Sequence, residues 1–526
     1  MSGSGPAGAA EFTSDLWVDE AIWGHRLHDE QTPWMVLLEL LGVLAFQARQ
    51  GKPFQEDAPL GGVAYEAPWR MALRNILFNN PFLEEVERRH SDDDGRWNEW
   101  LRRMADHTRG LTGAPDLTYL RKVFPQDGVG GGSFKDFARV VTLLRTTAIE
   151  ADSNKRWSSK FAFPYGPAAL LPDLGVKRDG SVSMDRRFFG RTGELAYLML
   201  CRSGRGAELY RHLERSVFAP RSPWNRLVAR LQPPDEARVT ASHTGYLPHA
   251  RLPDYEQLAD DLLAVLRLQL PGYDALPHLV NLLGLHLVLY YLRRAAAWVP
   301  DEPEAHLVLE IIAPKRTTVR DLSVESFQAN NLRGEKAVDR FITERVERSD
   351  AWREACAVGD DEERRAELAK AIYGAVRWWE VRPEADRPLT ADPAAALQQL
   401  RDAAVKRHRE HVAVVHTTYA QAIGLASRRG TRRMRYAPSD HLLQTLVLAV
   451  VPKRMEFQKF LAALWERYRM VVGYEQARGL HSAGDSDKPA FDENALRLEM
   501  RLASLGLLRR LSDACAYVEN PMEVPS

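Results

Sequence analysis

The chain has 526 residues, and its 71 basic and 71 acidic side chains leave a formal net charge of zero. This balance excludes a field over the whole molecule that would attract nucleic acid or an anionic membrane, so any such binding must come from a local patch. The three cysteines are far apart and form no disulfide framework, which suits a reducing cytoplasm. At about 100–200 residues per domain, the length predicts roughly three domains.

The amino-terminal stretch, residues 1–12, is rich in Gly, Ala and Ser. It has neither the basic start nor the apolar centre of a secretory signal. We therefore expect a disordered or added tail and a cytoplasmic protein.

Helical periodicity dominates the rest of the chain. The predicted helices are Trp34–Arg49, Phe134–Glu150, Gly193–Arg202, Ala207–Phe218, Tyr255–Leu270, Arg364–Trp379 and Ala394–Ser427. Ser133 suits the N-cap of the second of them. Leu276–Leu292 is apolar but short for a membrane span and holds three polar residues, so we predict a buried core helix and no membrane partner. The clearest strand is His306–Ile312, so the fold class is mainly α.

Loops rich in Pro or Gly divide the chain at Pro125–Gly132, Pro164–Gly180 and Val381–Pro393. We predict an N-terminal helical domain over 13–150 and a central, mostly helical region over 151–390. A further boundary near residue 252 is an alternative. A basic helix and linker over 391–435 then leads to a C-terminal domain over 436–526.

The last ninety residues predict a winged-helix-like domain. Helices are expected at His441–Val450, Met455–Arg469 and Glu493–Leu505. Gly506 suits the position of positive φ that ends a helix, and two short apolar strands follow it around the turn Ser512-Asp513. Three helices followed by a β-hairpin make the winged-helix arrangement, a relative of the helix-turn-helix.

Basic residues in and before this domain are candidates for binding nucleic acid. A winged helix that binds DNA places its third helix in the major groove. Arginines lie on the outer face of the third predicted helix and at the wing, and the run RRGTRRMR just upstream can neutralise several phosphates. The candidate residues are Arg428, Arg429, Arg432, Arg433, Arg435, Arg497, Arg501, Arg509 and Arg510.

Other interpretations of these residues stay open. The third predicted helix also carries Glu493 and Glu499. Winged helices frequently serve as protein-docking modules, and an arginine run is often ordinary solvated surface. Contact with DNA, docking to a protein and a purely structural role are therefore alternatives at this point.

No catalytic signature occurs in the sequence, which lacks a nucleophile elbow, a kinase set and a dinucleotide-binding fingerprint. The stretch Gly128–Lys135 does not have the Gly-Lys-Ser/Thr order of a P-loop, so we expect a hinge. Glu310 and Lys315 have the wrong spacing for a restriction-type nuclease. The acidic run Asp92–Asp94 lies in a predicted turn without partner ligands. We assign no catalytic residue and no cofactor.

Two further groups have a structural and a functional interpretation. His408, His411 and His416 share one predicted helix, but no HExxH pattern is present, so solvated histidines are favoured over a metal site. Lys155–Tyr165 alternates basic and aromatic residues, as in surfaces that stack nucleic-acid bases. Burial of these aromatics in the core is the favoured interpretation.

The closing sequence, with YAPSDHLL, FLAALWERYRMVVG and FDENALRLEMRLASLGLLRRLSDACAYVENP, resembles the tails of large helical accessory proteins of bacterial multi-gene anti-phage defence operons. The resemblance covers about a sixth of the chain and carries no catalytic residue. It implies a subunit of a DNA-targeting complex. We therefore predict a non-enzymatic adaptor that binds DNA or other protein subunits. The alternatives are a divergent metal-dependent nuclease or nucleotide hydrolase and a purely structural interaction subunit.

Overall fold

The computed structural model describes residues 17–25, 27, 31–55, 63–68, 71–109, 116–126, 129–149, 160–170, 175–176, 182–183, 192–219, 222–233, 238–243, 246–271, 273–312, 317–376, 389–428, 433–480, 487–512 and 515–522. Several predicted features lie outside these residues. They are the tail over 1–12, Gly128, residues 155–159, Lys315, most of the linker over 381–393, Arg429 and Arg432.

The protein is mainly α-helical, and a long central helix, α12 (Ala275–Trp298), forms the middle of its main core. The helices packed against it include α1 (Val18–Trp23), α2 (Pro33–Arg49) and α11 (Pro253–Arg267), while α8 (Thr192–Cys201) packs on α2 and α9 (Gly206–Ser216) packs on α11. By length and composition α12 could cross a membrane, but 83% of its apolar window is buried inside the protein. It is therefore the core helix that the sequence predicts.

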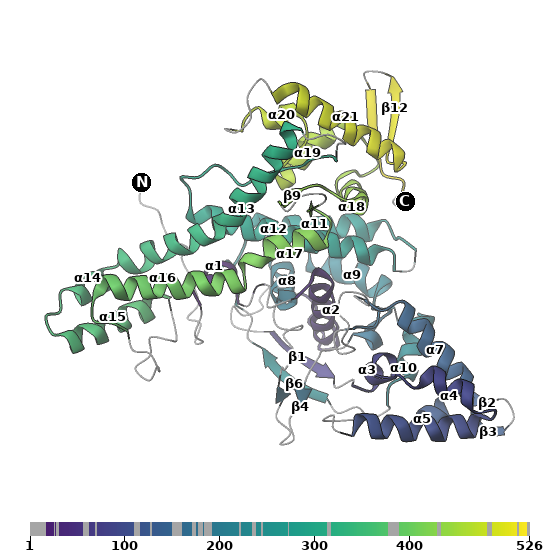
Figure 1. The fold of residues 1–526 in the computed structure, drawn as a ribbon. Coiled ribbons are helices and arrows are strands. Elements are labelled where there is room, and N and C mark those ends of the chain that lie inside the picture. The colour runs from purple at the N-terminus through teal and green to yellow at the C-terminus, as the bar shows by residue number, and fades with distance from the viewer. Residues whose placement is uncertain are drawn as a thin grey trace.

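A second hydrophobic core lies in a lobe at one end of the molecule (Figure 1). Its helices are α3 (Met71–Phe78), α4 (Leu83–Arg89), α5 (Asp93–Thr108), α6 (Leu120–Val123), α7 (Phe134–Thr146) and α10 (Pro223–Arg230). Ser133 caps α7 as predicted. The turn predicted at Asp92–Asp94 is wrong, because Asp92 accepts a hydrogen bond from the Gly95 N–H and starts α5. Acidic side chains suit a helix amino terminus.

A helical arm projects from the body (Figure 1). It consists of α13 (Thr318–Ile342), the π-helical turn Thr343–Glu347, α14 (Asp350–Cys356), α15 (Asp361–Val376) and α16 (Pro393–Glu410). The single helix predicted over Ala394–Ser427 is wrong. The chain leaves the helix at His411 and continues as α17 (Ala413–Ala422). This break lets His408 and His416 enter the interior against different neighbours.

The strands are short and mostly paired in twos. The antiparallel pairs are β1 (Val63–Pro68) with β6 (Arg238–His243), β2 (Pro125–Gln126) with β3 (Val129–Gly132), β4 (Gly175–Val176) with β5 (Val182–Ser183), and β8 (Ala426–Ser427) with β9 (Arg435–Tyr436). The predicted strand His306–Ile312 forms only β7 (Leu307–Val308), which runs parallel to β11 (Met470–Val471). This parallel pair joins the body to the C-terminal residues.

The C-terminal residues form a compact group of helices and strands, which we call the C-terminal module (residues 440–522). Its elements are α18 (Asp440–Val450), β10 (Arg454–Glu456), α19 (Phe457–Tyr468), β11, α20 (Tyr474–Ala477), α21 (Lys488–Ser504), β12 (Leu508–Ser512) and β13 (Cys515–Glu519). The strands β10, β13 and β12 make one antiparallel sheet in that order. The three predicted helices and the positive φ of Gly506 are confirmed.

Candidate interaction surface of the C-terminal module

The inward face of α21 is fixed to the body of the protein. Phe491, Leu498 and Leu502 are buried on this face. The Asn494 amide donates to the carbonyls of Leu309 and Val472 at 3.0 and 2.9 Å and accepts from the Ile311 N–H at 2.8 Å. These bonds tie the helix to the β7/β11 pair, so its opposite face has a defined place on the surface.

The outward face of α21 has an apolar centre. Leu496 and Met500 lie one turn apart, and their exposed fractions are 44% and 57%. Ala503 is exposed one turn further on. Because inward residues recur at 491, 494, 498 and 502, the positions 496, 500 and 503 form one stripe on the other side of the helix.

Exposed apolar side chains are concentrated in this module. Within the described ranges seven large hydrophobic side chains are exposed, and four of them belong to the module: Leu496, Met500, Leu511 and Met522. Leu511 lies in the β12–β13 hairpin, which stands beside the carboxyl end of α21 (Figure 1). Exposed apolar groups that gather in one place, unlike scattered ones, mark interaction surfaces.

Three of the four predicted arginines in the module are paired with carboxylates of the same module. Arg497 pairs with Glu493, Arg501 with Asp440 at 2.6 Å, and Arg510 with Glu499 at 2.9 Å. Arg509 is exposed and lies opposite Tyr517 in the hairpin. A phosphate bound at Arg497, Arg501 or Arg510 would compete with the carboxylate that is already paired with that arginine.

The predicted basic run is divided by the fold. Arg435 is only 2% exposed and forms an ion pair with Glu310, whose other oxygen accepts from Arg320 at 2.7 Å. Arg435 is therefore part of the interior and cannot reach a phosphate, which corrects its assignment as a nucleic-acid-binding residue. Arg428 and Arg433 are exposed on the loop between β8 and β9.

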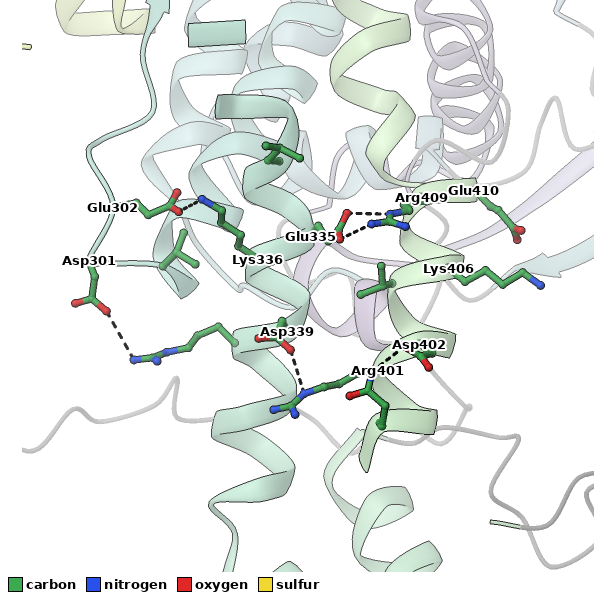
Figure 2. Close-up of a pocket in the computed structure, with 15 residues that line it drawn as sticks. Asp301, Glu302, Glu335, Lys336, Asp339, Arg401, Asp402, Lys406, Arg409 and Glu410 are labelled. Carbon is green, nitrogen blue, oxygen red and sulfur yellow. Dashed lines mark hydrogen bonds and ion pairs between the residues drawn. The ribbon is translucent and has the colours of Figure 1, made fainter. Parts of the chain in front are cut away.

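A charged groove of about 1100 Å³ lies between α13 and α16 in the arm. Figure 2 shows ion pairs that cross it, with Arg409 donating twice to Glu335 at 2.6 and 2.9 Å and Arg401 lying 3.0 Å from Asp339. Partly exposed pairs of this kind contribute about 0.2–1 kcal/mol each. They add to the contact between α13 and α16, both of which also bury apolar residues.

The predicted histidine group is not brought together. His408 stacks on Trp23, whereas His416 forms a hydrogen bond of 2.6 Å with the Tyr436 hydroxyl. Burial lowers the pKa of His408 to about 4 and that of His416 to about 3, so both rings are neutral at pH 7. Over the described part of the chain, no three His, Cys, Asp or Glu side chains are placed to hold a metal ion.

The remaining candidate residues from the sequence have structural roles. Glu310 is used in the ion pairs with Arg435 and Arg320. Phe161 and Tyr165, from the basic and aromatic stretch, are 2% and 7% exposed, which confirms the core interpretation for these two residues.

Sequence reasoning missed a buried acidic pair at the amino end of α1. Asp19 and Glu20 are each 3% exposed, and the Arg407 guanidinium of α16 lies 3.6 Å from Asp19 and 3.2 Å from Glu20. Burial raises the pKa of Asp19 to about 7, although Arg407 opposes the shift. Adjacent acidic residues usually indicate surface, so only the tertiary fold places this pair in the interior.

The raised pKa of Asp19 makes the stability of the protein depend on pH. An acid whose pKa is raised on folding holds its proton more tightly in the folded state, so stability falls as pH rises from about 4 to about 7. Asp19→Asn should remove this loss because the amide stays neutral and its oxygen can still accept the Glu20 N–H. We expect the variant to be more stable than wild type by about 1–4 kcal/mol at pH 8, and by much less at pH 5.

Thermal unfolding of both proteins at the two pH values measures this difference. A gain in stability that is equal at pH 5 and pH 8 would contradict the assignment of the proton to Asp19.

Comparison with known proteins found no matching family model, no matching curated protein and no matching solved structure. The function must therefore be argued from the residues of this chain.

Proposed function

We propose that this protein is a non-enzymatic adaptor that docks a partner protein through its C-terminal module, and that the module is a winged helix. The order α18, β10, α19, β11, α20, α21, β12, β13 supports this, since apart from the four-residue α20 it places three helices before a hairpin and adds a strand between the first two. The sheet order β10-β13-β12 puts the hairpin next to that added strand. In this arrangement α21 is the third helix, whose outer face makes the contacts.

The apolar centre of that face favours a protein partner. A helix that reads DNA presents polar and basic groups to the base edges. Here Leu496 and Met500 occupy the centre, and Arg497 and Arg501 beside them are paired with acids. Apolar residues spaced by four and three positions are the pattern of a helix that packs against another protein surface.

The setting we propose is a cytoplasmic complex that targets DNA in bacterial anti-phage defence. The resemblance of the closing residues to accessory proteins of defence operons supports this setting. In such a complex the adaptor positions subunits, and other chains supply the chemistry.

Charge placed in the apolar stripe tests the docking proposal. The double variant Leu496→Glu/Met500→Glu should lose the proteins that co-purify with the tagged chain from its own cells. Both side chains point into solvent, so folding should be little affected. The matched control is Leu143→Glu, which changes an equally exposed leucine (45%) on α7. Equal recovery of every co-purifying protein by the wild type, the control and the double variant would refute docking through this face.

DNA contact is the second candidate, favoured by the exposure of Arg428, Arg433 and Arg509. Fluorescence anisotropy with labelled duplex and single-stranded DNA over a salt series tests it. If these arginines contact phosphates, binding should fall steeply with salt and should be weakened in the variant with Arg428, Arg429, Arg432 and Arg433 changed to Ala. No binding at low salt would leave protein docking as the role of the module.

A further inference from the structure

Helices α9 and α10 and the chain between them carry an excess of positive charge. Residues 205–230 hold six arginines and only two acidic residues, Glu208 and Glu214. Four of the arginines are exposed on the two helices, and we call them the α9–α10 arginines: Arg211, Arg215, Arg226 and Arg230. Within the described ranges, none of their side chains forms an ion pair or a hydrogen bond. In a chain of zero net charge, this excess makes the surface locally positive.

The two acidic residues do not pair with these arginines. Glu208 is bound from outside the segment by Arg267 of α11, at 2.6 Å. Glu214 accepts a hydrogen bond of 3.1 Å from the Tyr210 hydroxyl. By contrast, each of the three arginines of α5 lies within 2.9 Å of a carboxylate. The α9–α10 arginines are therefore available to an anionic partner.

Each helix presents its pair of arginines on the side opposite its buried residues. The buried side holds Leu209 and Leu213 in α9 and Val228 in α10. Positions two residues away from these lie on the far side of a helix, and both arginine pairs occupy such positions. Within each pair the arginines are four residues apart, so their Cβ atoms are separated by about 5–6 Å. Each pair can therefore reach neighbouring phosphates along one strand of a nucleic acid.

The helices themselves gain little from these charges. Like charges four residues apart destabilise a helix. The helix dipole favours a positive charge only in the last turn, where Arg215 and Arg230 lie. Arg226 is the fourth residue of α10, near the end at which the dipole disfavours it. A charge pattern that opposes helix stability and has no partner in the fold favours a role in binding.

We propose that the α9–α10 arginines bind the phosphate backbone of a double-helical nucleic acid, independently of its base sequence. The planar guanidinium group matches a phosphate through two parallel hydrogen bonds. At most about 25 Å separate the end of α9 at Ser216 from the start of α10 at Pro223, which is less than one turn of duplex DNA, about 34 Å. One duplex is therefore long enough to contact both helices. This surface lies outside the C-terminal module, so the inference does not rest on the docking role of α21.

Two features favour a duplex over other anionic partners. A membrane surface would bind through exposed apolar side chains beside the charges. Among the described residues, none of the large exposed hydrophobic side chains is on α9 or α10. A single strand would require free aromatic rings on which its bases could stack. Tyr210 of α9 instead packs against the main core, and Trp224 of α10 stacks on Tyr165 with the ring centroids 4.7 Å apart.

Fluorescence anisotropy of the purified full chain with labelled duplex DNA, duplex RNA and single-stranded DNA over a salt series tests the proposal. The variants are Arg211→Ala/Arg215→Ala, Arg226→Ala/Arg230→Ala and the combination of all four substitutions. The matched control changes four exposed arginines, each of which is paired with a carboxylate three or four residues earlier, to alanine: Arg102, Arg109, Arg348 and Arg353. Thermal melting checks the fold, and the melting temperature of the combined variant should not fall, because alanine favours a helix and the repulsion is removed.

With four phosphate contacts, the wild type should lose about 100-fold in affinity for a duplex between about 50 and 200 mM salt. Each double variant should lower the salt dependence by about half, since two contacts are lost. The combined variant should bind at least about 100-fold more weakly at the lower salt concentration, and the control should bind like the wild type. Binding to either duplex supports the proposal, and the comparison of DNA with RNA shows which one supplies the phosphates.

Several results would overturn the proposal. They are a wild type that binds no duplex at low salt, a combined variant that binds as tightly as the wild type, and a control that loses as much affinity as the combined variant. A loss confined to the variant with Arg428, Arg429, Arg432 and Arg433 changed to Ala would place the contact at the loop between β8 and β9. Tighter binding of single-stranded DNA than of either duplex would contradict the double-helical partner. None of these results depends on α21, so the docking proposal stands or fails separately.

Discussion

Replacing Glu310 with alanine should destabilise the protein by about 3–5 kcal/mol. Glu310 is 1% exposed and binds two guanidinium groups, those of Arg435 and Arg320. Without the carboxylate, the guanidinium of Arg435 stays in an interior site at 2% exposure and loses the acid that forms its ion pair there. The cost of that buried charge exceeds the net strength of the ion pair itself, which explains the size of the expected loss.

The matched control is Glu335→Ala, which breaks the pair with Arg409 in the arm. The side chains of that pair are 33% and 64% exposed, so the expected loss is below about 1 kcal/mol. Urea denaturation followed by circular dichroism and tryptophan fluorescence measures both variants. Equal losses from the two substitutions would show that burial does not set the strength of the Glu310 pairs.

The helices that sequence reasoning placed well are those whose burial follows the helical period. α7 and α9 are examples, since the buried residues of each recur every three or four positions. α13 was missed although it has 25 residues. It buries Ser323, Ser326, Asn330 and Arg333, which interrupt the apolar pattern. The His306 carbonyl, for example, accepts hydrogen bonds from Ser326 and Asn330, and a helical pattern in the sequence does not show a partner so distant along the chain.

The candidate surface was partly visible in the sequence. The helical period of Glu493–Leu505 places Leu498 and Leu502 on one side of the helix and Leu496 and Met500 on the other. The pairing of the arginines was not visible. Arg501 meets an acid 61 residues away, and Arg435 meets one 125 residues away. No local pattern distinguishes an arginine that binds phosphate from one that completes the interior.

Replacing Asp261 with alanine should also cost about 3–5 kcal/mol at pH 7. The Asp261 side chain is fully buried and accepts hydrogen bonds of 2.7 Å from His286 Nε2 and from the Tyr468 hydroxyl, together with one from Arg467. Burial alone would raise the pKa of this carboxyl, but His286, Arg467 and Tyr468 together lower it. Its contribution is therefore present above the unfolded pKa of about 4 and is lost as pH falls through the folded value.

The dependence of stability on pH distinguishes the contribution of the Asp261 charge from that of the size of its side chain. Asp261→Asn keeps the size and one acceptor oxygen but removes the charge, so it should lose part of the stability at pH 7 and approach wild type in acid. Urea denaturation at pH 7 and in acid measures this, and a loss that does not shrink with falling pH would contradict the linkage.

Asp261 is on α11, His286 on α12 and Tyr468 at the end of α19, so the cluster joins the body to the C-terminal module. Asp261→Ala should therefore increase hydrogen exchange first in α19 and the elements after it, before the central helix responds.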